Sequence, residues 1–416
     1  MITKFDDILA GINIQNVTFE DFKSKVSILD ISDTSGTFAV RSDIKTFLDR
    51  VVNKTGDTRK DRLDLYLTNL YDMLVTNAEK SLRAWYEKYI ELKMSMSDYI
   101  NMADGGCLND RVFNGAANAK FGRLAKNINF NDFYNTKKLY MNDSEYVYGL
   151  MKVMYENFHI RNSLAAPAFF DILIGDDDYT RVWNYFMMGA NKASIFNPYT
   201  YRSILNDIFE GETLFAPVMG WNTYQQGFYT SKFKHFIATD VIPGVVNNGS
   251  WLHEQYKTSR SGTLMDAIGE EEKTVDLYLC PSEKLQERYG FVDKYRESVD
   301  AVLFSPPYFD LEIYPGEEQS VNSFGDYNAW LEGYWRETVK LCRQVMKPNA
   351  KFAFVIRNYR NHDKVDNSIS QDMRDVVCEE LTYLEKYDIK WNAQGGSRQA
   401  HKMRGGNFED VWVFKK

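Results

Sequence analysis

A stiff polar loop follows one apolar run in the second half of the chain. The run is Ala301–Phe304, and directly after it come Ser305, Pro306, Pro307, Tyr308 and Phe309. The prolines fix φ and remove two amide donors, so the loop is rigid and carbonyl oxygens can face a cleft. A hydroxyl, carbonyl acceptors and an aromatic face suit the binding of a planar group that carries an amine. The alternative is a strand-end proline turn with a buried tyrosine.

The elements that must position this loop alternate between short apolar runs and amphipathic helices. The strand-like runs are Thr213–Phe215, His235–Thr239, Val275–Cys280, Ala301–Phe304 and Phe352–Ile356, with a further pair near Leu381–Trp391 and Val411–Phe414. Such alternation predicts an α/β layer with a mostly parallel sheet. Parallel sheets bind ligands at the carboxyl ends of their strands, so the residues after each run are the candidates for a site. Before the run at 352–356, we expect Pro348 to end a long helix.

The two halves of the chain differ in pattern. Up to about Asn191 apolar residues recur at a spacing of three to four, which is typical of helices. From about Phe196 onward the strand-like runs begin. We therefore expect a mainly helical domain over residues 1–192, a candidate for DNA or target recognition, and an α/β catalytic domain over residues 193–416.

Composition restricts the class of protein. The chain has 416 residues, 44% of them hydrophobic, which is enough for a sizeable core. It contains no run of about 18 apolar residues and no leader pattern, so we expect no membrane association. Four cysteines and five histidines are scattered without metal spacing, which predicts no metal site and a reducing, cytoplasmic setting. A net charge of −8 argues against an overall basic surface, but a local basic face could still bind phosphates.

The strand-end loop resembles motif IV of the amino-methylating DNA methyltransferases, whose form is (Asp/Asn/Ser)-Pro-Pro-(Tyr/Phe/Trp). The longer string "SPPYFDLEIY" is similar in particular to a group of these enzymes common in bacteriophage genomes. The resemblance implies a Rossmann-like class I methyltransferase sheet, mostly parallel with a C-terminal antiparallel strand. It also implies S-adenosylmethionine as methyl donor, double-stranded DNA as partner, and a role in DNA modification or restriction-modification in a bacterial or phage-infected cell.

Two segments before this loop resemble the family's cofactor motifs. Phe196, Asn197 and Pro198 open a helix, as motif X does, and proline suits the first helical turn. Further on, "LFAPVMGWNT" resembles motif I, the glycine-containing turn that lets the backbone approach the cofactor. Its matching residues are Pro217, Gly220 and Trp221. The departures are Ala216, where an acidic residue is usual, and Asn222 and Thr223 in place of glycines.

The remaining matches lie at later strand ends and in the tail. Asp240 stands where motif II carries an acidic residue that accepts hydrogen bonds from the ribose hydroxyls. Cys280 to Glu283 would lie near the adenine, with Ser282 as the cofactor contact. The C-terminal loop has a basic cluster, whose members are Arg398, His401, Lys402 and Arg404. The cluster could contact DNA phosphates. The alternative is that the loop is simply exposed to solvent.

The resemblance implies a mechanism of direct transfer to a flipped base. Tyr308 would stack on the base with Phe309 holding the pocket, while Ser305 and the Pro306 carbonyl accept hydrogen bonds from the exocyclic amine. Neither a covalent intermediate nor a metal is needed. Serine in the first position slightly favours N4 of cytosine over N6 of adenine. Two alternatives stay open: methylation of an RNA base or a protein glutamine, and a non-catalytic DNA-binding relative with a decayed cofactor motif.

Overall fold

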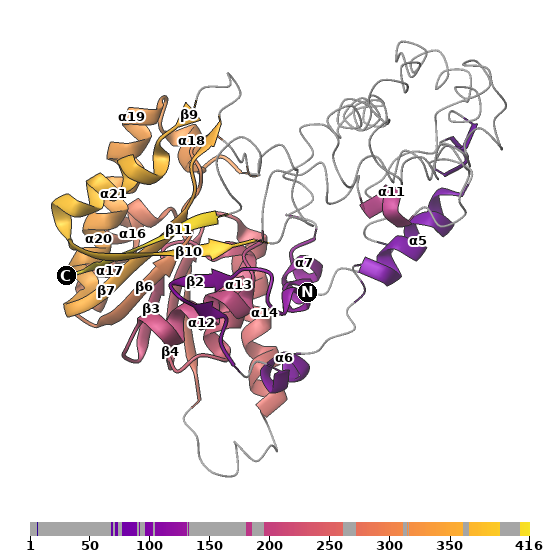
Figure 1. The fold of residues 1–416 in the computed structure, drawn as a ribbon, viewed down its shortest axis with the longest axis horizontal. Coiled ribbons are helices and arrows are strands. Elements are labelled where there is room, and N and C mark those ends of the chain that lie inside the picture. The colour runs from indigo at the N-terminus through magenta and orange to yellow at the C-terminus, as the bar shows by residue number, and fades with distance from the viewer. Residues whose placement is uncertain are drawn as a thin grey trace.

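In the computed structural model, the second half of the chain forms a layered α/β unit (Figure 1). The residues described there are 195–260, 272–310, 314, 316–360, 366–391 and 408–416. In the first half they are 6, 68–69, 71–73, 77–89, 91, 96–102, 105–130, 132 and 180–184. No helix among these residues has both the length and the apolar character needed to cross a bilayer.

Nine strands of the described chain form one mixed sheet. In chain order they are β1 (Leu108–Asn109), β2 (Val112–Asn114), β3 (Thr213–Ala216), β4 (His235–Asp240), β5 (Thr274–Leu279), β6 (Val299–Phe304), β7 (Met346–Ile356), β10 (Thr382–Lys390) and β11 (Phe408–Lys415). Their spatial order is β1-β2-β10-β11-β7-β6-β3-β4-β5. Strands β5, β4, β3, β6 and β7 are parallel neighbours, whereas β11 is antiparallel to both β7 and β10. A separate hairpin consists of β8 (Tyr359–Arg360) and β9 (Asp366–Asn367).

This topology confirms the predicted fold class. Strand order reverses between β3 and β6, and the last strand of the chain, β11, inserts antiparallel beside β7. That arrangement is the Rossmann-like class I methyltransferase sheet. All seven predicted runs are strands, and the central ones are short, apolar and buried; in β6, for example, the last four residues are fully buried.

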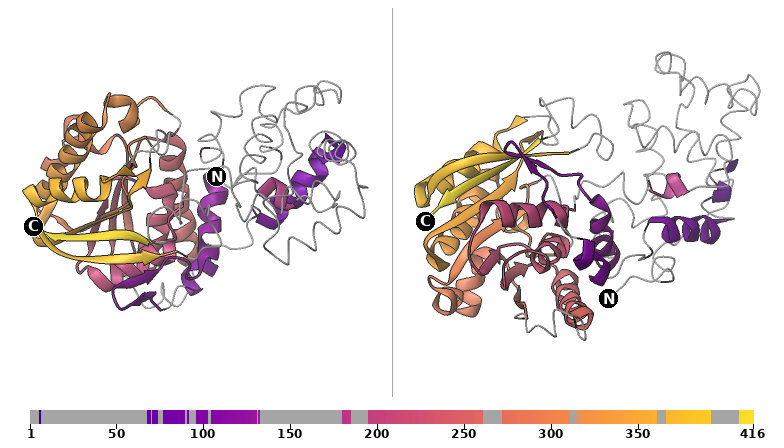
Figure 2. Two further views of the ribbon diagram at one scale, coloured as in Figure 1. Left: turned by 45° about the horizontal axis from the view of Figure 1, so that its top comes forward. Right: turned by 60° about the horizontal axis from the view of Figure 1, so that its bottom comes forward.

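Helices cover both faces of the sheet (Figures 1 and 2). One layer contains α12 (Pro198–Ile208), α13 (Thr223–Tyr229) and α14 (Pro243–Arg260). The other contains α16 (Leu285–Tyr289), α17 (Phe291–Tyr295), α20 (Glu337–Val345) and α21 (Ile369–Glu380). Helix α20 ends at Val345, shortly before Pro348, and Pro348 itself lies inside β7. A proline disfavours helical geometry in the residue before it as well as at its own position.

Short elements between these helices complete the second layer. They are η6 (Ser282–Lys284), α18 (Ser320–Ser323), α19 (Tyr327–Trp330) and η7 (Leu331–Arg336). Asp326 caps α19 by accepting the Ala329 amide, as an aspartate at a helix start is suited to do. Two of them, α19 and η7, pack aromatic side chains near the carboxyl end of β6.

The first half of the chain contributes directly to the sheet. Strand β2 pairs in parallel with β10, and η2 (Ala119–Phe121) and α7 (Gly122–Ile128) follow it against α12 and the loop after β3. Helix α6 (Met96–Met102) lies beside α14. Helices α5 (Ala78–Tyr89) and α11 (Thr180–Asn184) pack on each other through a hydrogen bond from Trp183 Nε1 to Ser81 Oγ of 2.9 Å. The domain boundary at residue 192 stays a prediction.

Candidate active site

The stiff loop lies at the carboxyl end of β6, in the middle of the sheet. Ser305 and Pro307 are half-buried, and Pro306 is buried. Tyr308 is 7% exposed, and its hydroxyl accepts a hydrogen bond from the Arg357 amide at 3.2 Å. The Ser305 amide donates to the Tyr224 hydroxyl at 3.0 Å. The loop is therefore fixed at both ends, from β7 and from α13.

Phe309 turns toward the helical layer. Its φ is +29°, and its ring packs against Tyr327 and Trp330 at centroid distances of 5.6 and 5.7 Å. The two aromatic side chains after the prolines therefore contact different elements. Tyr308 is hydrogen-bonded to the end of β7, and Phe309 packs on α19.

The turn after β3 adopts an unusual backbone conformation. Ala216 and Pro217 are buried at the strand end, and three consecutive residues, Gly220, Trp221 and Asn222, have φ of 52°, 57° and 64°. Asparagine tolerates this left-handed region better than most residues, which explains how it can replace a glycine. Its amide also donates to the Val245 carbonyl at 2.9 Å, which fixes the turn to the start of α14.

Gly220 cannot carry a side chain without a clash. A Cβ at this position would lie 2.4–2.7 Å from three atoms of the Tyr224 ring, and the positive φ adds strain. We expect Gly220→Ala to destabilise the fold by roughly 1–3 kcal/mol and to weaken cofactor binding. Thermal unfolding and calorimetric titration with S-adenosylhomocysteine measure these two effects. Gly290→Ala is the matched control for backbone strain, because Gly290 has φ +58° and an added Cβ would make only an ordinary contact, 3.6 Å from Asp293 Oδ2.

The segment resembling motif X forms as predicted. Asn197 is the N-cap of α12, its side chain accepts the Tyr199 amide at 3.0 Å, and Pro198 occupies the first turn. The Asn197 amide group also donates to the carbonyls of Gly115 and Ala117 at 3.0 and 2.6 Å. Phe196 packs edge-on against three aromatic rings, which belong to Tyr201, Tyr224 and Trp391. These residues therefore join the first half of the chain to the sheet.

Asp240 lies at the carboxyl end of β4, beside the turn after β3. Its carboxylate accepts the amides of Met219 at 3.2 Å and Ile242 at 3.0 Å. Burial raises the pKa of Asp240 to about 6, against the lowering effect of these amides. The bonded amides leave further acceptor positions on its two oxygens. A carboxylate with such positions at a strand end suits the two hydroxyls of a ribose.

Two side chains from the first half of the chain also reach this edge, and sequence reasoning missed both. Asn129 donates from its amide to the Trp221 carbonyl at 2.9 Å. Asp132 packs on the start of α14 so closely that a Cβ at Gly244 would lie 1.8 Å from its carboxylate. Its charge adds to the raised pKa of Asp240. Their distance from the motifs along the chain gave no local signal.

The end of β5 presents a glutamate where a serine was predicted to act. Ser282 is 3% exposed, and its hydroxyl pairs with the Thr338 hydroxyl at 2.8 Å, toward α20. Glu283 Oε2 is buried and has no hydrogen-bond partner among the described residues, and burial raises the pKa of this carboxyl. An unpaired buried acceptor costs free energy and marks Glu283 as a candidate ligand contact.

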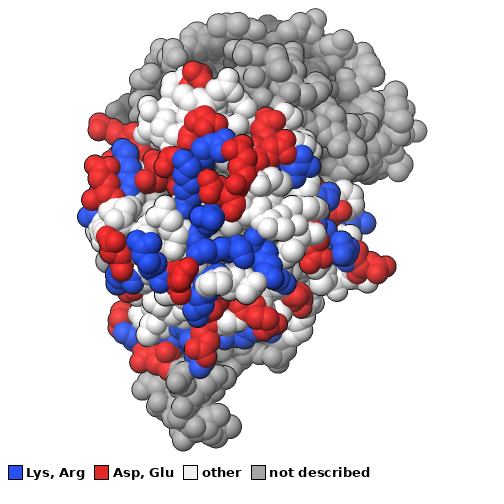
Figure 3. Space-filling view, turned by 90° about the vertical axis from the view of Figure 1, so that its left-hand side faces the viewer, with Lys and Arg blue, Asp and Glu red and all other residues white. Residues whose placement is uncertain are grey.

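The four residues of the predicted basic cluster, Arg398, His401, Lys402 and Arg404, lie outside the described residues. The face that carries α20 and α21 mixes both signs of charge (Figure 3). There Arg336 pairs with Glu332 and Glu379, and Lys340 pairs with Glu337. Such neutralised charges offer little attraction to a phosphate backbone. Across the described ranges, no group of three or more acidic, histidine or cysteine side chains could hold a metal.

Comparison with known proteins gives structural similarity alone. No protein family and no curated protein matches the sequence. A candidate DNA modification methylase from Thermus thermophilus is 13% identical over 32% of this chain and 50% of its own, with a TM-score of 0.24. TrmN from Thermus thermophilus is 12% identical over 54% and 51%, with a TM-score of 0.33.

A third similar structure is the N-methyltransferase NodS from Bradyrhizobium japonicum, solved with S-adenosyl-L-homocysteine. It is 8% identical over 49% of this chain and 78% of its own, with a TM-score of 0.29. The chain spans about half the length of each of the two Thermus structures. The fold assignment rests on the strand order and register described above.

Proposed function

We propose that this protein is an S-adenosylmethionine-dependent methyltransferase that acts on the exocyclic amine of a base flipped out of double-stranded DNA. The observation that carries the proposal is the place of Ser305-Pro306-Pro307-Tyr308. The loop stands at the carboxyl end of β6, beside the strand pair β3 and β4 whose ends carry the left-handed turn and Asp240. Ligands of doubly wound sheets bind where the strand order reverses, and here that is between β3 and β6.

The described residues fit the proposed cofactor. Asp240 offers further acceptor positions for a ribose diol, and Glu283 offers an acceptor one strand further, where an adenine amine would lie. Gly220, in the turn after β3, has no side chain and a positive φ, which favours close approach of a ligand to the backbone there. When bound, S-adenosylmethionine supplies an electrophilic methyl group.

Ala216 leaves the end of β3 without a carboxylate. The ammonium group of the cofactor therefore needs another acceptor. We assign this role to Asp132, because its carboxylate lies against the start of α14 and its charge acts on Asp240. This assignment is part of the proposal, and Asp132→Asn tests it by calorimetric titration with S-adenosylhomocysteine.

The loop residues would position the amine for attack. The Ser305 hydroxyl and the Pro306 carbonyl accept hydrogen bonds from the two amine hydrogens, which turns the nitrogen lone pair toward the methyl group. Tyr308 stacks on the base and holds its plane. The rate gain then comes from orientation and from acceptors placed in advance, with the chain itself forming no covalent bond to the base.

We further propose that the target is N4 of cytosine rather than N6 of adenine, on the serine at position 305. The basic charges on the face that carries α20 and α21 are paired with acidic side chains. We therefore assign the contacts with DNA phosphates to the basic cluster of the C-terminal loop, Arg398, His401, Lys402 and Arg404. The first half of the chain is the proposed region for target recognition.

Transfer of a labelled methyl group to duplex DNA tests the function. We expect label in duplex DNA that contains the target sequence, and digestion to nucleosides should place it in N4-methylcytosine. Label in RNA or in a protein glutamine, with none in DNA, would show that the substrate is RNA or protein and not DNA. If S-adenosylhomocysteine binds but no substrate accepts label, the protein is a non-catalytic relative. Random-sequence duplexes remove the need to know the recognition site in advance.

A further inference from the structure

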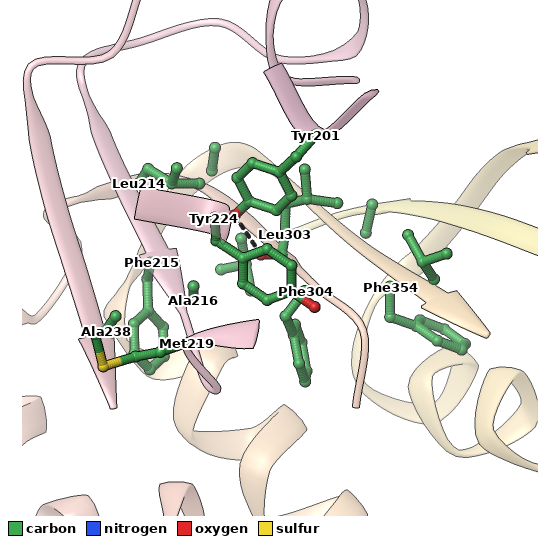
Figure 4. Packing of buried hydrophobic residues seen from close by; sticks show 14 of the residues in the cluster. Tyr201, Leu214, Phe215, Ala216, Met219, Tyr224, Ala238, Leu303, Phe304 and Phe354 are labelled. Carbon is green, nitrogen blue, oxygen red and sulfur yellow. Dashed lines mark hydrogen bonds between the residues drawn. The ribbon is translucent and has the colours of Figure 1, made fainter. Parts of the chain in front are cut away.

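Two buried tyrosines, one from each of two helices, lie at the end of β6 (Figure 4). Tyr201 of α12 donates from its hydroxyl to the Leu303 carbonyl at 2.7 Å. Tyr224 of α13 accepts the Ser305 amide on its hydroxyl at 3.0 Å. The two rings stack with centroids 4.4 Å apart and planes 11° from parallel. The end of the strand and the first loop residue are thus held by one aromatic pair.

Of the two tyrosines, Tyr224 also contacts the turn after β3. The ring of Tyr224 fills the space beside Gly220, where an added Cβ would lie 2.4–2.7 Å from three of its atoms. Gly220 opens the left-handed stretch that continues through Asn222. A shift of this turn by a few tenths of an ångström must therefore displace the Tyr224 ring, because packed interiors do not compress.

Burial makes this contact rigid and keeps the Tyr201 hydroxyl neutral. Tyr201 is 1% exposed and Tyr224 is 2% exposed, and Phe196 packs edge-on against both rings. Burial raises the pKa of Tyr201 well above its usual value, so its proton stays available to the Leu303 carbonyl. A rigid ring whose hydroxyl holds the Ser305 amide transmits displacement from one loop to the other.

We propose that Tyr224 is a positioning residue that couples occupancy of the Gly220–Asn222 turn to the orientation of Ser305, while Tyr201 holds the end of β6 in place. The inference rests on the proposed function, since it assigns the turn to the cofactor and Ser305 to the target amine. Coupling of this kind is reciprocal. Bound cofactor orders the amine-accepting loop, and a base held by that loop strengthens cofactor binding by the same factor.

Hydrogen exchange of the full-length protein tests the coupling without any DNA. In a peptide covering residues 303–308, the prolines carry no amide hydrogen and the first two residues lose label, so Ser305 and Tyr308 remain. We expect S-adenosylhomocysteine to slow exchange of this peptide about fivefold, the factor that corresponds to one hydrogen bond of typical net strength. In Tyr224→Phe, exchange should be faster without ligand and should change less than about twofold on ligand addition.

Two variants serve as matched controls. Tyr201→Phe removes the neighbouring hydroxyl but leaves the link between Gly220 and Ser305, so its exchange should still respond to the ligand. Tyr99→Phe removes a buried tyrosine hydroxyl, 2% exposed and 3.3 Å from Thr230 Oγ1, that lies outside this contact. The coupling role is overturned if the ligand slows exchange in Tyr224→Phe as much as in the wild type. It is also overturned if Tyr99→Phe loses the slowing of exchange just as Tyr224→Phe does.

Calorimetric titration with the same ligand tests cofactor binding separately from the coupling through Tyr224. Heat of binding together with an unchanged exchange rate in the wild type overturns this inference and leaves the proposed function standing. No heat of binding in the wild type overturns the cofactor assignment and the coupling with it. Binding to Tyr224→Phe within about threefold of wild type is expected, because the variant keeps the ring that packs on Gly220.

Discussion

Tyr308→Ala is expected to lower methyl transfer to duplex DNA by about 10- to 100-fold while leaving S-adenosylhomocysteine affinity within about twofold. Stacking of a base on an aromatic side chain contributes about 1–3 kcal/mol, and alanine removes all of it. The hydrogen bond from the Arg357 amide is lost as well, so the loop is less fixed. Single-turnover kinetics with labelled cofactor, alongside calorimetric titration, measures both quantities.

Tyr308→Phe is the matched control for this prediction. It keeps the stacking face and loses only the hydroxyl that accepts the Arg357 amide, so a loss of less than about fivefold is expected. Full activity in Tyr308→Ala would show that the ring does not stack on the base. An equal loss in Tyr308→Ala and Tyr308→Phe would assign the effect to the hydroxyl instead.

Cofactor affinity should fall as pH falls through about 6, because protonation of Asp240 adds a donor and reduces its capacity to accept hydrogen bonds from the ribose. Burial raises the pKa of this group to about 6. Below that value the group is protonated and loses acceptor capacity, so the dissociation constant should rise about tenfold per pH unit. Asp240→Asn should weaken binding about 10- to 100-fold at pH 7.5 and should flatten the pH dependence. Calorimetric titration from pH 5 to 8 measures both.

The same carboxyl has the opposite effect on the ligand-free fold. A pKa that is higher in the folded protein than in the unfolded chain means that protonation stabilises the fold. The contribution of Asp240 is present below pH 4 and is lost as pH rises through about 6. In Asp240→Asn, the difference in unfolding free energy from wild type should therefore grow in favour of the variant between pH 5 and pH 7. A pH-independent difference in both stability and affinity would contradict the raised pKa.

Local sequence predicted the strands and the first turns around the site well. Strands β3 to β7 contain short apolar runs with polar residues after them, and Asn197-Pro198 has the local chemistry of a helix start. These features depend on a few neighbouring residues. The site edge could be predicted because parallel strands place their carboxyl ends together whatever the rest of the chain does.

Partners far apart along the chain could not be predicted in the same way. Asn129, Asp132 and Tyr224 look like ordinary helix residues, and their roles come from packing against the turns after β3 and β4. The direction of a side chain is equally hidden. Ser282 faces Thr338 and Phe309 faces Trp330, because the helical layer beneath the site offers a hydroxyl partner and aromatic rings.

The parallel pairing of β2 with β10 has a consequence for how the protein is made. Val112 lies opposite Asp388, so the partner of this strand is synthesised long after the strand itself. Until then the carbonyls of Gly115 and Ala117 can meet Asn197, but within the described sheet β2 can pair only with β1. Contacts between distant parts of a chain form slowly. A nascent chain stalled before β10 would expose this short strand, whereas synthesis of β10 and β11 allows the sheet to close.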